Sequence, residues 1–134
     1  WGAPQITVGE GNYMAELVAR YVLGDAAERV TDSRGTIAPL DPEVLTVVVV
    51  DGSAGLTQRA PLAFIDGAVD THEQMARFLD GRGALPDELT ARGVVEPALW
   101  HELAALDASN QRLIAQDATH GVGRFVATWQ VDHD

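Results

Sequence analysis

Asp51 and Ser53 are the residues of this sequence whose types and position are best suited to chemistry. They lie in the run LTVVVVDGSAG at positions 45–55, where β-branched residues give way to an acid, small residues and glycines. This pattern predicts a strand over Leu45–Val50 that is buried on both faces and ends at an open edge. Ligands collect beyond such strand ends in open α/β sheets. We therefore expect the functional site at Asp51.

Known catalytic motifs of this general kind do not match the run. A serine-hydrolase elbow requires glycine where Asp51 stands. A phosphate loop requires a Gly-Lys-Ser/Thr ending, which the sequence lacks. A phosphatase of the haloacid type requires a second aspartate where Ser53 stands. The reaction therefore stays open, and the alternative is a glycine-rich turn whose acid caps backbone amides.

Further polar residues are expected to join this site. His120 precedes Gly121-Val122-Gly123, a turn that would bring the imidazole toward it. Arg59, in the predicted loop after the strand, would hold a ligand carboxylate or pair with Asp66. Convergent polar groups of this kind are typical of small-molecule sites. We predict a small-ligand pocket formed by Asp51, Ser53, Gln58, Arg59 and His120.

The histidines do not form a recognisable metal motif. None of them pairs with another at the i, i+4 spacing of a helical zinc site; they are His72, His101, His120 and His133. We expect His72 and His101 on partly exposed helix faces and His133 frayed near the terminus. Glu96 is expected to complement the dipole at a helix start, and Trp100 to lie in the core. No metal site is predicted for this chain alone.

The elements before Asp51 predict half of a βαβ unit. Residues 5–8 fit a short strand, Asn12 fits a helix cap, and apolar residues recur at helical spacing from Met14 to Val22. Gly24 would end that helix. Because parallel strands need a crossover, the helix would connect the two strands. Residues 25–43 are polar and form a long connection, part of which we expect to be mobile.

The elements after Asp51 are predicted to be helices and then strands. Residues 66–70 lead into a helix carrying Met75, Phe78 and Leu79, followed by a short helix over 87–92 and another over 97–106. Residues 111–116 predict a strand edge, and 121–130 alternate with the period of a strand. The predicted fold class is α/β: a small mixed sheet flanked by helices, in one domain over residues 1–134.

Composition excludes several classes of partner. The net charge is −11, so the surface should repel nucleic-acid phosphates and anionic lipid headgroups. No apolar run approaches the ~20 residues that a membrane span requires, and no signal peptide is visible. Cysteine is absent, which excludes disulfides and fits a reducing cytoplasm. We expect a cytoplasmic protein that binds neither nucleic acid nor membrane.

The run VVVVDGSAGLTQRAPLAF at 47–64 and the run GVGRFVATW at 121–129 together resemble a known family. They are similar to the second half of the class III extradiol ring-cleavage dioxygenase superfamily, above all its uncharacterised subunit-B-like actinobacterial branch. In that branch a buried strand runs into Asp-Gly-Ser-Ala and then an Ala-Pro pair, here Asp51–Ala54 and Ala60-Pro61. The likeness extends over about residues 45–129.

The resemblance implies a chain that lacks most of the ring-cleaving apparatus. Active members hold Fe(II) with two histidines from the N-terminal half, which has no counterpart here, and one glutamate four residues before a tryptophan. Glu96 before Trp100 fits that spacing. A further catalytic histidine follows Gly-Leu-Ser, whereas Gln58 follows Gly55-Leu56-Thr57 here, and a neutral amide cannot exchange a proton near pH 7. Three ligands must converge to hold Fe(II), so iron is expected only if an N-terminal half completes the site.

Three functions stay open. The first is a dioxygenase-like domain that is not catalytic alone and binds a small ligand near Asp51. The second is the C-terminal part of a metal-dependent oxygenase or hydrolase, completed by an N-terminal segment or partner that would use Glu96 as a ligand. The third is a self-associating interaction module, because an incomplete sheet leaves edges and apolar surface that need cover.

Overall fold

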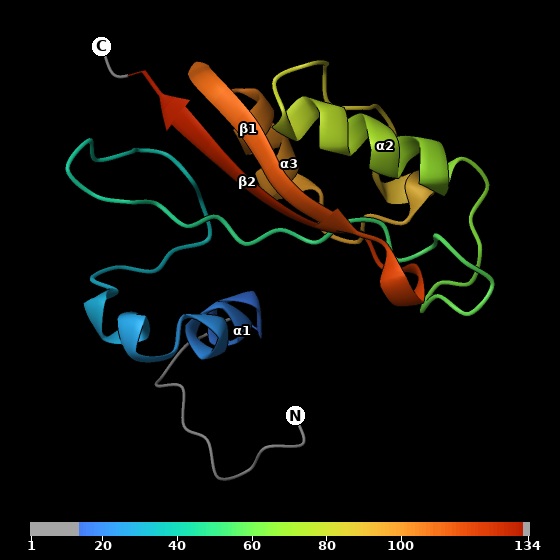
Figure 1. Ribbon diagram of the computed structural model, residues 1–134, viewed down its shortest axis with the longest axis horizontal. Coiled ribbons are helices and arrows are strands. Elements are labelled where there is room, and N and C mark those ends of the chain that lie inside the picture. Colours follow the sequence, from blue (N-terminus) through green and yellow to red (C-terminus); the bar gives the residue numbers. More distant parts are fainter. Residues whose placement is uncertain (1–13, 133–134) are drawn as a thin grey trace, which may run out of the picture.

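The computed structural model describes residues 14–132, so the strand predicted over 5–8 and His133 lie outside the described residues. Figure 1 shows the elements, which in chain order are α1 (Met14–Leu23), the 3₁₀ turn η1 (Gly24–Arg29), α2 (Ala68–Leu79), the 3₁₀ turn η2 (Thr90–Arg92), α3 (Ala98–Ala104), β1 (Ala108–Asp117), the 3₁₀ turn η3 (Thr119–Gly121) and β2 (Arg124–Val131). The predicted α/β class is confirmed, because helices accompany a small sheet within the described chain.

The sheet is an antiparallel hairpin of β1 and β2. Leu113 lies opposite Ala127, and Asp117 lies opposite Arg124 beside the turn. The inner face of β2 carries Phe125, Ala127 and Trp129, whose side chains are half-buried between exposed neighbours. This alternation confirms the strand predicted from the period of residues 121–130, because one face packs on the core and the other meets water.

Helices α2 and α3 supply the other side of the core. Met75 and Phe78 of α2 and Trp100 of α3 are buried, and Trp100 is fully inaccessible. The ring of Phe78 meets Trp129 of β2 edge-on, with 5.2 Å between centroids. The Trp129 indole N–H donates to the carbonyl oxygen of Leu79 at 2.8 Å. Aromatic contacts therefore join the helices to the hairpin.

Two predicted helices are shorter in the structure, and one of them is a 3₁₀ turn. The short helix expected over 87–92 is reduced to η2, and the helix expected over 97–106 is α3, with Pro97 as its N-cap. Helix α1 is confirmed. Gly24 ends the α-helix but not the helical path of the chain, because the 3₁₀ turn η1 begins at Gly24, which has φ +56°. In Figure 1, α1 and η1 lie on the opposite side of the 40–50 segment from α2.

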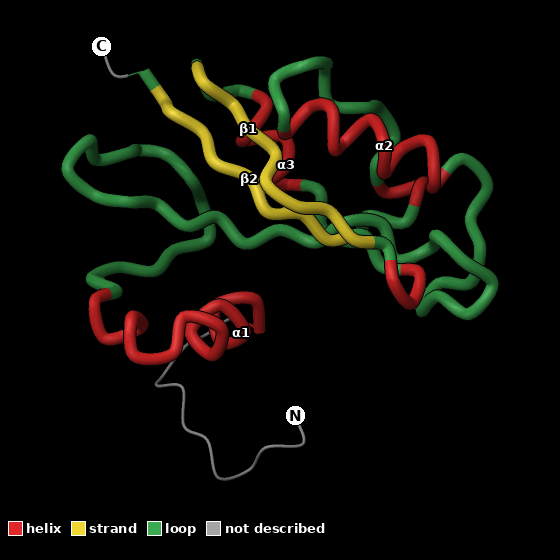
Figure 2. The backbone as a smooth tube through the Cα atoms, in the orientation of Figure 1, coloured by secondary structure: helices red, strands yellow, loops and turns green. Residues whose placement is uncertain are grey.

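The strand predicted over Leu45–Val50 is wrong. These residues form no regular element, and within the described chain they make no backbone–backbone hydrogen bond. Leu45 is 88% exposed and Val47 is 58% exposed, whereas Val48 and Val50 pack against the core. Figure 2 shows the segment as a loop that crosses below the strands. A strand needs a neighbour for its peptide groups, and β1 and β2 pair with each other across a short turn.

The predicted parallel βαβ unit is also wrong, because it required that strand. The sheet of the described residues holds only β1 and β2, and their pairing is antiparallel. An antiparallel pair needs no crossover helix, so α1 is not required to connect strands.

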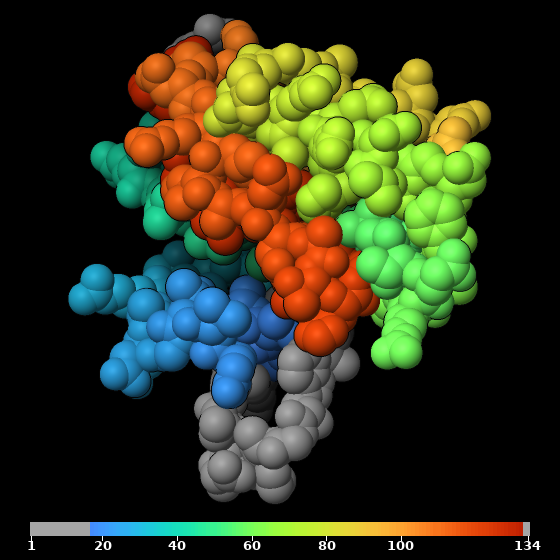
Figure 3. All heavy atoms as spheres, turned by 45° about the vertical axis from the view of Figure 1, so that its right-hand side comes forward, coloured from blue at the N-terminus to red at the C-terminus, as the bar shows by residue number. Residues whose placement is uncertain are grey.

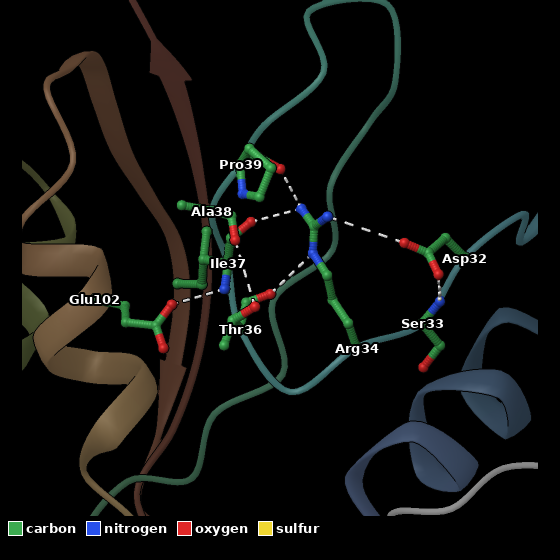
Figure 4. A network of polar contacts seen from close by, with 8 residues as sticks. All are labelled: Asp32, Ser33, Arg34, Thr36, Ile37, Ala38, Pro39 and Glu102. Carbon is green, nitrogen blue, oxygen red and sulfur yellow. Dashed lines mark hydrogen bonds and ion pairs between the residues drawn. The ribbon is translucent and has the colours of Figure 1, made fainter.

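The polar connection before residue 44 is anchored to α3 by one buried residue. The Arg34 guanidinium donates to the carbonyl oxygens of Thr36, Ile37 and Pro39 and so closes a tight loop, shown in Figure 4. Ile37 at the tip of this loop is only 3% exposed, and its N–H donates to the Glu102 carboxylate at 2.7 Å. The loop therefore adds an apolar side chain to the core and satisfies that residue's amide.

Candidate functional site

Ser53 is a structural residue in this fold. Its side chain is fully buried, and its hydroxyl donates to the carbonyl oxygen of Arg92 at 2.6 Å. The Ser53 hydroxyl oxygen in turn accepts the Gly55 N–H at 3.2 Å. Both hydrogen-bonding functions of the hydroxyl are therefore used inside the protein, and no face of it meets solvent. Ser53 holds the 52–55 turn on the loop that contains η2.

Asp51 is held through its backbone while its carboxylate faces water. The Asp51 carbonyl oxygen accepts the indole N–H of Trp100 at 2.8 Å, which ties the chain just after residues 44–50 to α3. Within residues 14–132 no hydrogen bond or ion pair of the Asp51 carboxylate occurs. The alternative prediction, that this acid caps backbone amides, is therefore not met in the described chain.

The turn after β1 packs directly on the loop after Asp51. The Gly123 N–H donates to the Ser53 carbonyl oxygen at 2.8 Å, and the Leu56 N–H donates to that of Gly121 at 3.1 Å. A Cβ at Gly52 would lie 2.5 Å from the Gly123 oxygen, so this approach requires glycine. Figure 3 shows the orange-red atoms of the β1–β2 connection against the green atoms of the 52–64 loop.

This contact places the candidate polar residues on neighbouring surface turns. Gln58 and Arg59 are exposed on the loop that touches Gly121, and His120 is exposed next to that glycine, with φ +63°. Arg59 makes no ion pair in the described part of the chain, so the predicted pair with Asp66 is not formed there. The carbonyl oxygen of Asp66 accepts a hydrogen bond from the Arg92 guanidinium at 2.5 Å. The Leu56–Gly121 hydrogen bond thus places the loop that carries Gln58 and Arg59 beside the turn that carries His120, while Ser53 is buried.

His72 is a buried imidazole that sequence reasoning placed wrongly at a partly exposed helix face. It is 8% exposed, and its ring stacks on Phe125 with centroids 4.7 Å apart. Its Nδ1 atom has no hydrogen-bond partner among the described residues. Burial lowers the pKa of His72, although the nearby carboxylates of Glu73 and Asp117 act to raise it. The signal was present, because His72, Met75, Ala76 and Leu79 recur at the spacing of one helix face.

Gly123 explains why the imidazole fits beneath β2. A Cβ on Gly123 would lie 2.7 Å from His72 Nδ1. The glycine therefore leaves the ring room to stack on Phe125.

The residues considered as metal ligands are scattered. Glu96 is exposed just before Pro97, the N-cap of α3, and His101 is exposed on that helix. Trp100 is a core residue, as predicted, and its indole N–H donates to the Asp51 carbonyl oxygen. Within residues 14–132 no three His, Asp or Glu side chains come together in a way that would hold a metal ion.

Two surface hollows lie away from Asp51, on either side of the loop that follows α2. The larger has a volume of about 460 Å³ and includes Phe78, His101 and Gln111 in its lining. The smaller has about 350 Å³ and includes Arg77 and Arg82. Sequence reasoning missed this region, because its walls come from α2, α3 and β1.

Comparisons of this chain with protein-family models, with curated proteins and with solved structures found no match. No helix in the described part of the chain is long and apolar enough to cross a membrane.

Proposed function

We propose that this chain is an extradiol-dioxygenase-like α/β domain that does not cleave rings alone and works with its valine segment covered by a second part. The valine segment is residues 44–50. The observation that supports this proposal is a run of strand-forming residues that belongs to no sheet of the described residues, with Leu45 and Val47 largely exposed. The covering part is an N-terminal half, carried by the same polypeptide or by a partner chain.

The composition of the valine segment argues for a covered state. A run of β-branched residues is typical of a strand buried on both faces. Within residues 14–132, Val48 and Val50 are the members of this segment that pack against the core, while Val44, Leu45 and Val47 are at least half exposed. Covering a Val or Leu side chain is worth about 1.5–3 kcal/mol. An added strand would also pair the peptide groups of residues 45–50, which have no backbone partner among residues 14–132, as in β-strand addition.

The residues present do not fit an Fe(II) site on their own. Glu96 is a lone exposed carboxylate, and the imidazole of His72 is buried under β2. Two histidines and a carboxylate must converge on one side of such a metal. Gln58 also stands where the resemblance implies a proton-transferring histidine. A second part that brings two imidazoles would make Glu96 a ligand, and the chain alone supplies the scaffold.

Hydrogen–deuterium exchange tests the covered state. The protein purified from its native source should show slow exchange at 45–50, whereas the isolated chain should exchange quickly there and slowly in β1 and β2. Leu45→Asp should weaken the association of the chain with the covering part by tenfold or more, as measured by light scattering. Ile114→Asp is the matched control, because Ile114 is 57% exposed on β1. Equal exchange at 45–50 in both preparations would refute the proposal.

Anaerobic loading of the isolated chain with Fe(II) tests the catalytic half of the proposal. Catechols should turn over no faster than with free iron. Turnover well above free iron that is lost in Glu96→Gln would contradict it.

A second candidate function is small-ligand binding at the turns beside Asp51. The observation that favours it is the pair of backbone hydrogen bonds that hold the Gln58–Arg59 loop against the His120 turn. At least one ligand in a metabolite panel should raise the melting temperature of the wild type, and the same ligand should not raise that of Asp51→Ala or Arg59→Gln. Identical melting profiles with every ligand would remove this candidate.

We also propose a cytoplasmic setting without nucleic-acid partners. An oxidising compartment stabilises proteins through disulfides, which a chain without cysteine cannot form. Its net charge of −11 disfavours phosphate backbones. Fractionation of cells would place a tagged copy, and association with the envelope fraction would contradict the cytoplasmic setting.

A further inference from the structure

We propose that the two hollows beside residues 81–87 form one binding site for a small carboxylate with an apolar body. The rim shared by both hollows is formed by residues 83–87. In Figure 1 this loop is the yellow segment that leaves the end of α2. The site is separate from the valine segment and does not depend on the function proposed above.

The larger hollow suits the apolar body of such a ligand. Its volume of about 460 Å³ falls within the range of small-molecule sites, about 300–1,000 Å³. Phe78, Leu85 and Ala104 provide apolar surface. His101 and Gln111 also line it and can hydrogen-bond to a substituent. An apolar floor with a few polar groups is the usual composition of a ligand pocket.

The smaller hollow suits the carboxylate. Arg77 and Arg82 line it, in a chain whose net charge is −11 and which has 9 basic residues. The Nε of Arg82 is held by the Asp80 carboxylate at 2.6 Å. Arg77 makes no ion pair within residues 14–132, so its guanidinium is available to a ligand. A guanidinium matches the geometry of a carboxylate with two parallel hydrogen bonds.

Asp80 binds Arg82 and makes no ion pair with Arg77 within the described residues. Its carboxylate accepts the Leu113 N–H at 2.8 Å, which anchors the end of α2 to β1. That hydrogen bond, with Arg82 and Arg112 nearby, lowers the pKa of Asp80. The Asp80 carboxylate is thus flanked by Arg82 and Arg112, and Arg77 adds a further positive charge to the smaller hollow.

The backbone of the rim adds further donors. The N–H groups of Gly83, Ala84 and Leu85 have no acceptor in the part of the chain that the structure describes. They lie on the wall that both hollows share. Free amides beside a guanidinium favour an anion over a neutral ligand.

Replacing Asp87 is expected to have the opposite effect on binding to replacing Arg77. Its exposed carboxylate lines both hollows and repels a simple carboxylate ligand. Replacing it with asparagine should therefore strengthen binding, whereas removing Arg77 should weaken it. A general change in stability would not produce effects of opposite sign.

The test uses benzoate and its neutral counterpart benzamide, measured by titration calorimetry and by amide chemical shifts at low salt. Benzoate should bind in the millimolar range or tighter and shift the amides of 83–87, and benzamide should bind at least fivefold more weakly. Arg77→Gln should weaken benzoate binding at least fivefold, and Asp87→Asn should strengthen it about twofold or more.

Two variants make the result specific. Arg29→Gln removes the same charge from an exposed residue of η1 and should leave benzoate binding unchanged. Ala104→Leu should fill the apolar hollow and abolish binding while the protein stays folded by circular dichroism. No benzoate binding, equal binding of benzamide, or equal weakening by Arg29→Gln and Arg77→Gln would each overturn the proposal.

Discussion

Ser53 shows how a residue with catalytic potential is used for stability at the scale of single side chains. Its hydroxyl joins two loops by donating to Arg92 and accepting from Gly55. A nucleophile needs an exposed oxygen and a base within reach, and the fully buried Ser53 has neither among its contacts. The importance of the Asp51 run at this scale is therefore structural.

Ser53→Ala is expected to lower the free energy of unfolding by about 1–3 kcal/mol, because the buried Arg92 carbonyl oxygen loses its donor. Urea unfolding monitored by tryptophan fluorescence measures this. Ser33→Ala is the control on an exposed serine and should change the value by less than about 0.5 kcal/mol. Equal effects of the two changes would contradict the structural role of Ser53.

Acidification is expected to destabilise the protein through His72. Its folded pKa is lowered from the ordinary value of 6.5, so the unfolded chain binds the proton more readily. The free energy of unfolding should therefore fall as the pH drops below about 6.5, until the pH is below the folded pKa. The lowered pKa values of Asp80 and Asp117 act only below their ordinary value of 3.8, so the two effects occur in separate pH ranges.

The groups that face His72 define the control for this prediction. Glu73 lies on the same helix, and Asp117, paired with Arg124 at 3.7 Å, lies at the end of β1. Urea unfolding at pH 7.5 and 5.5 should show a loss of stability in the wild type and in His101→Gln. The loss should be much smaller in His72→Gln. The same loss in His72→Gln would show that another group is responsible.

At the scale of elements, the hairpin turn and the 52–61 loop depend on glycines where two backbones meet. Gly121 has φ +77°, and a Cβ there would lie 2.5 Å from Thr57 Oγ1 and 2.6 Å from the Ala60 Cβ. Gly123 leaves room for His72 in the same way. The contact that places the loop of Gln58 and Arg59 beside the turn of His120 is therefore set by glycines rather than by those side chains.

Gly121→Ala is expected to destabilise the protein by at least about 1 kcal/mol, because both its backbone conformation and its surroundings exclude a side chain. Gly83→Ala is the matched control, since its Cβ would meet only the Arg77 Cβ at 3.8 Å. Thermal unfolding compares the two. A smaller loss for Gly121→Ala than for Gly83→Ala would refute the account of this turn.

At the scale of the whole molecule, Trp100 connects most of the described chain. Its ring is fully buried and contacts Phe78 of α2 and Phe125 of β2, and its N–H holds the end of the valine segment at Asp51. The core is thus one aromatic cluster between helices and hairpin. Among the described residues, the valine segment packs on this cluster through Val48 and Val50.

Trp100→Phe is expected to lower the free energy of unfolding by about 2–4 kcal/mol, because it leaves a void and removes the donor to Asp51. Hydrogen exchange at 50–53 should also accelerate. Trp129→Phe removes one indole hydrogen bond from a half-buried site and should cost less, about 1 kcal/mol. A larger loss for Trp129→Phe would mean that Trp100 is not the centre of the core.

The sequence by itself determined the elements whose pattern is local. The helical spacing around Met75 and Phe78 and the alternation through Phe125 and Trp129 predicted α2 and β2, because each element buries one face of its own residues. Only the tertiary structure decided the state of Leu45–Val50, because a strand exists only where another segment pairs with its peptide groups. The burial of Ser53 and His72 and the hollows beside 81–87 were decided there too, because their walls come from segments distant in sequence.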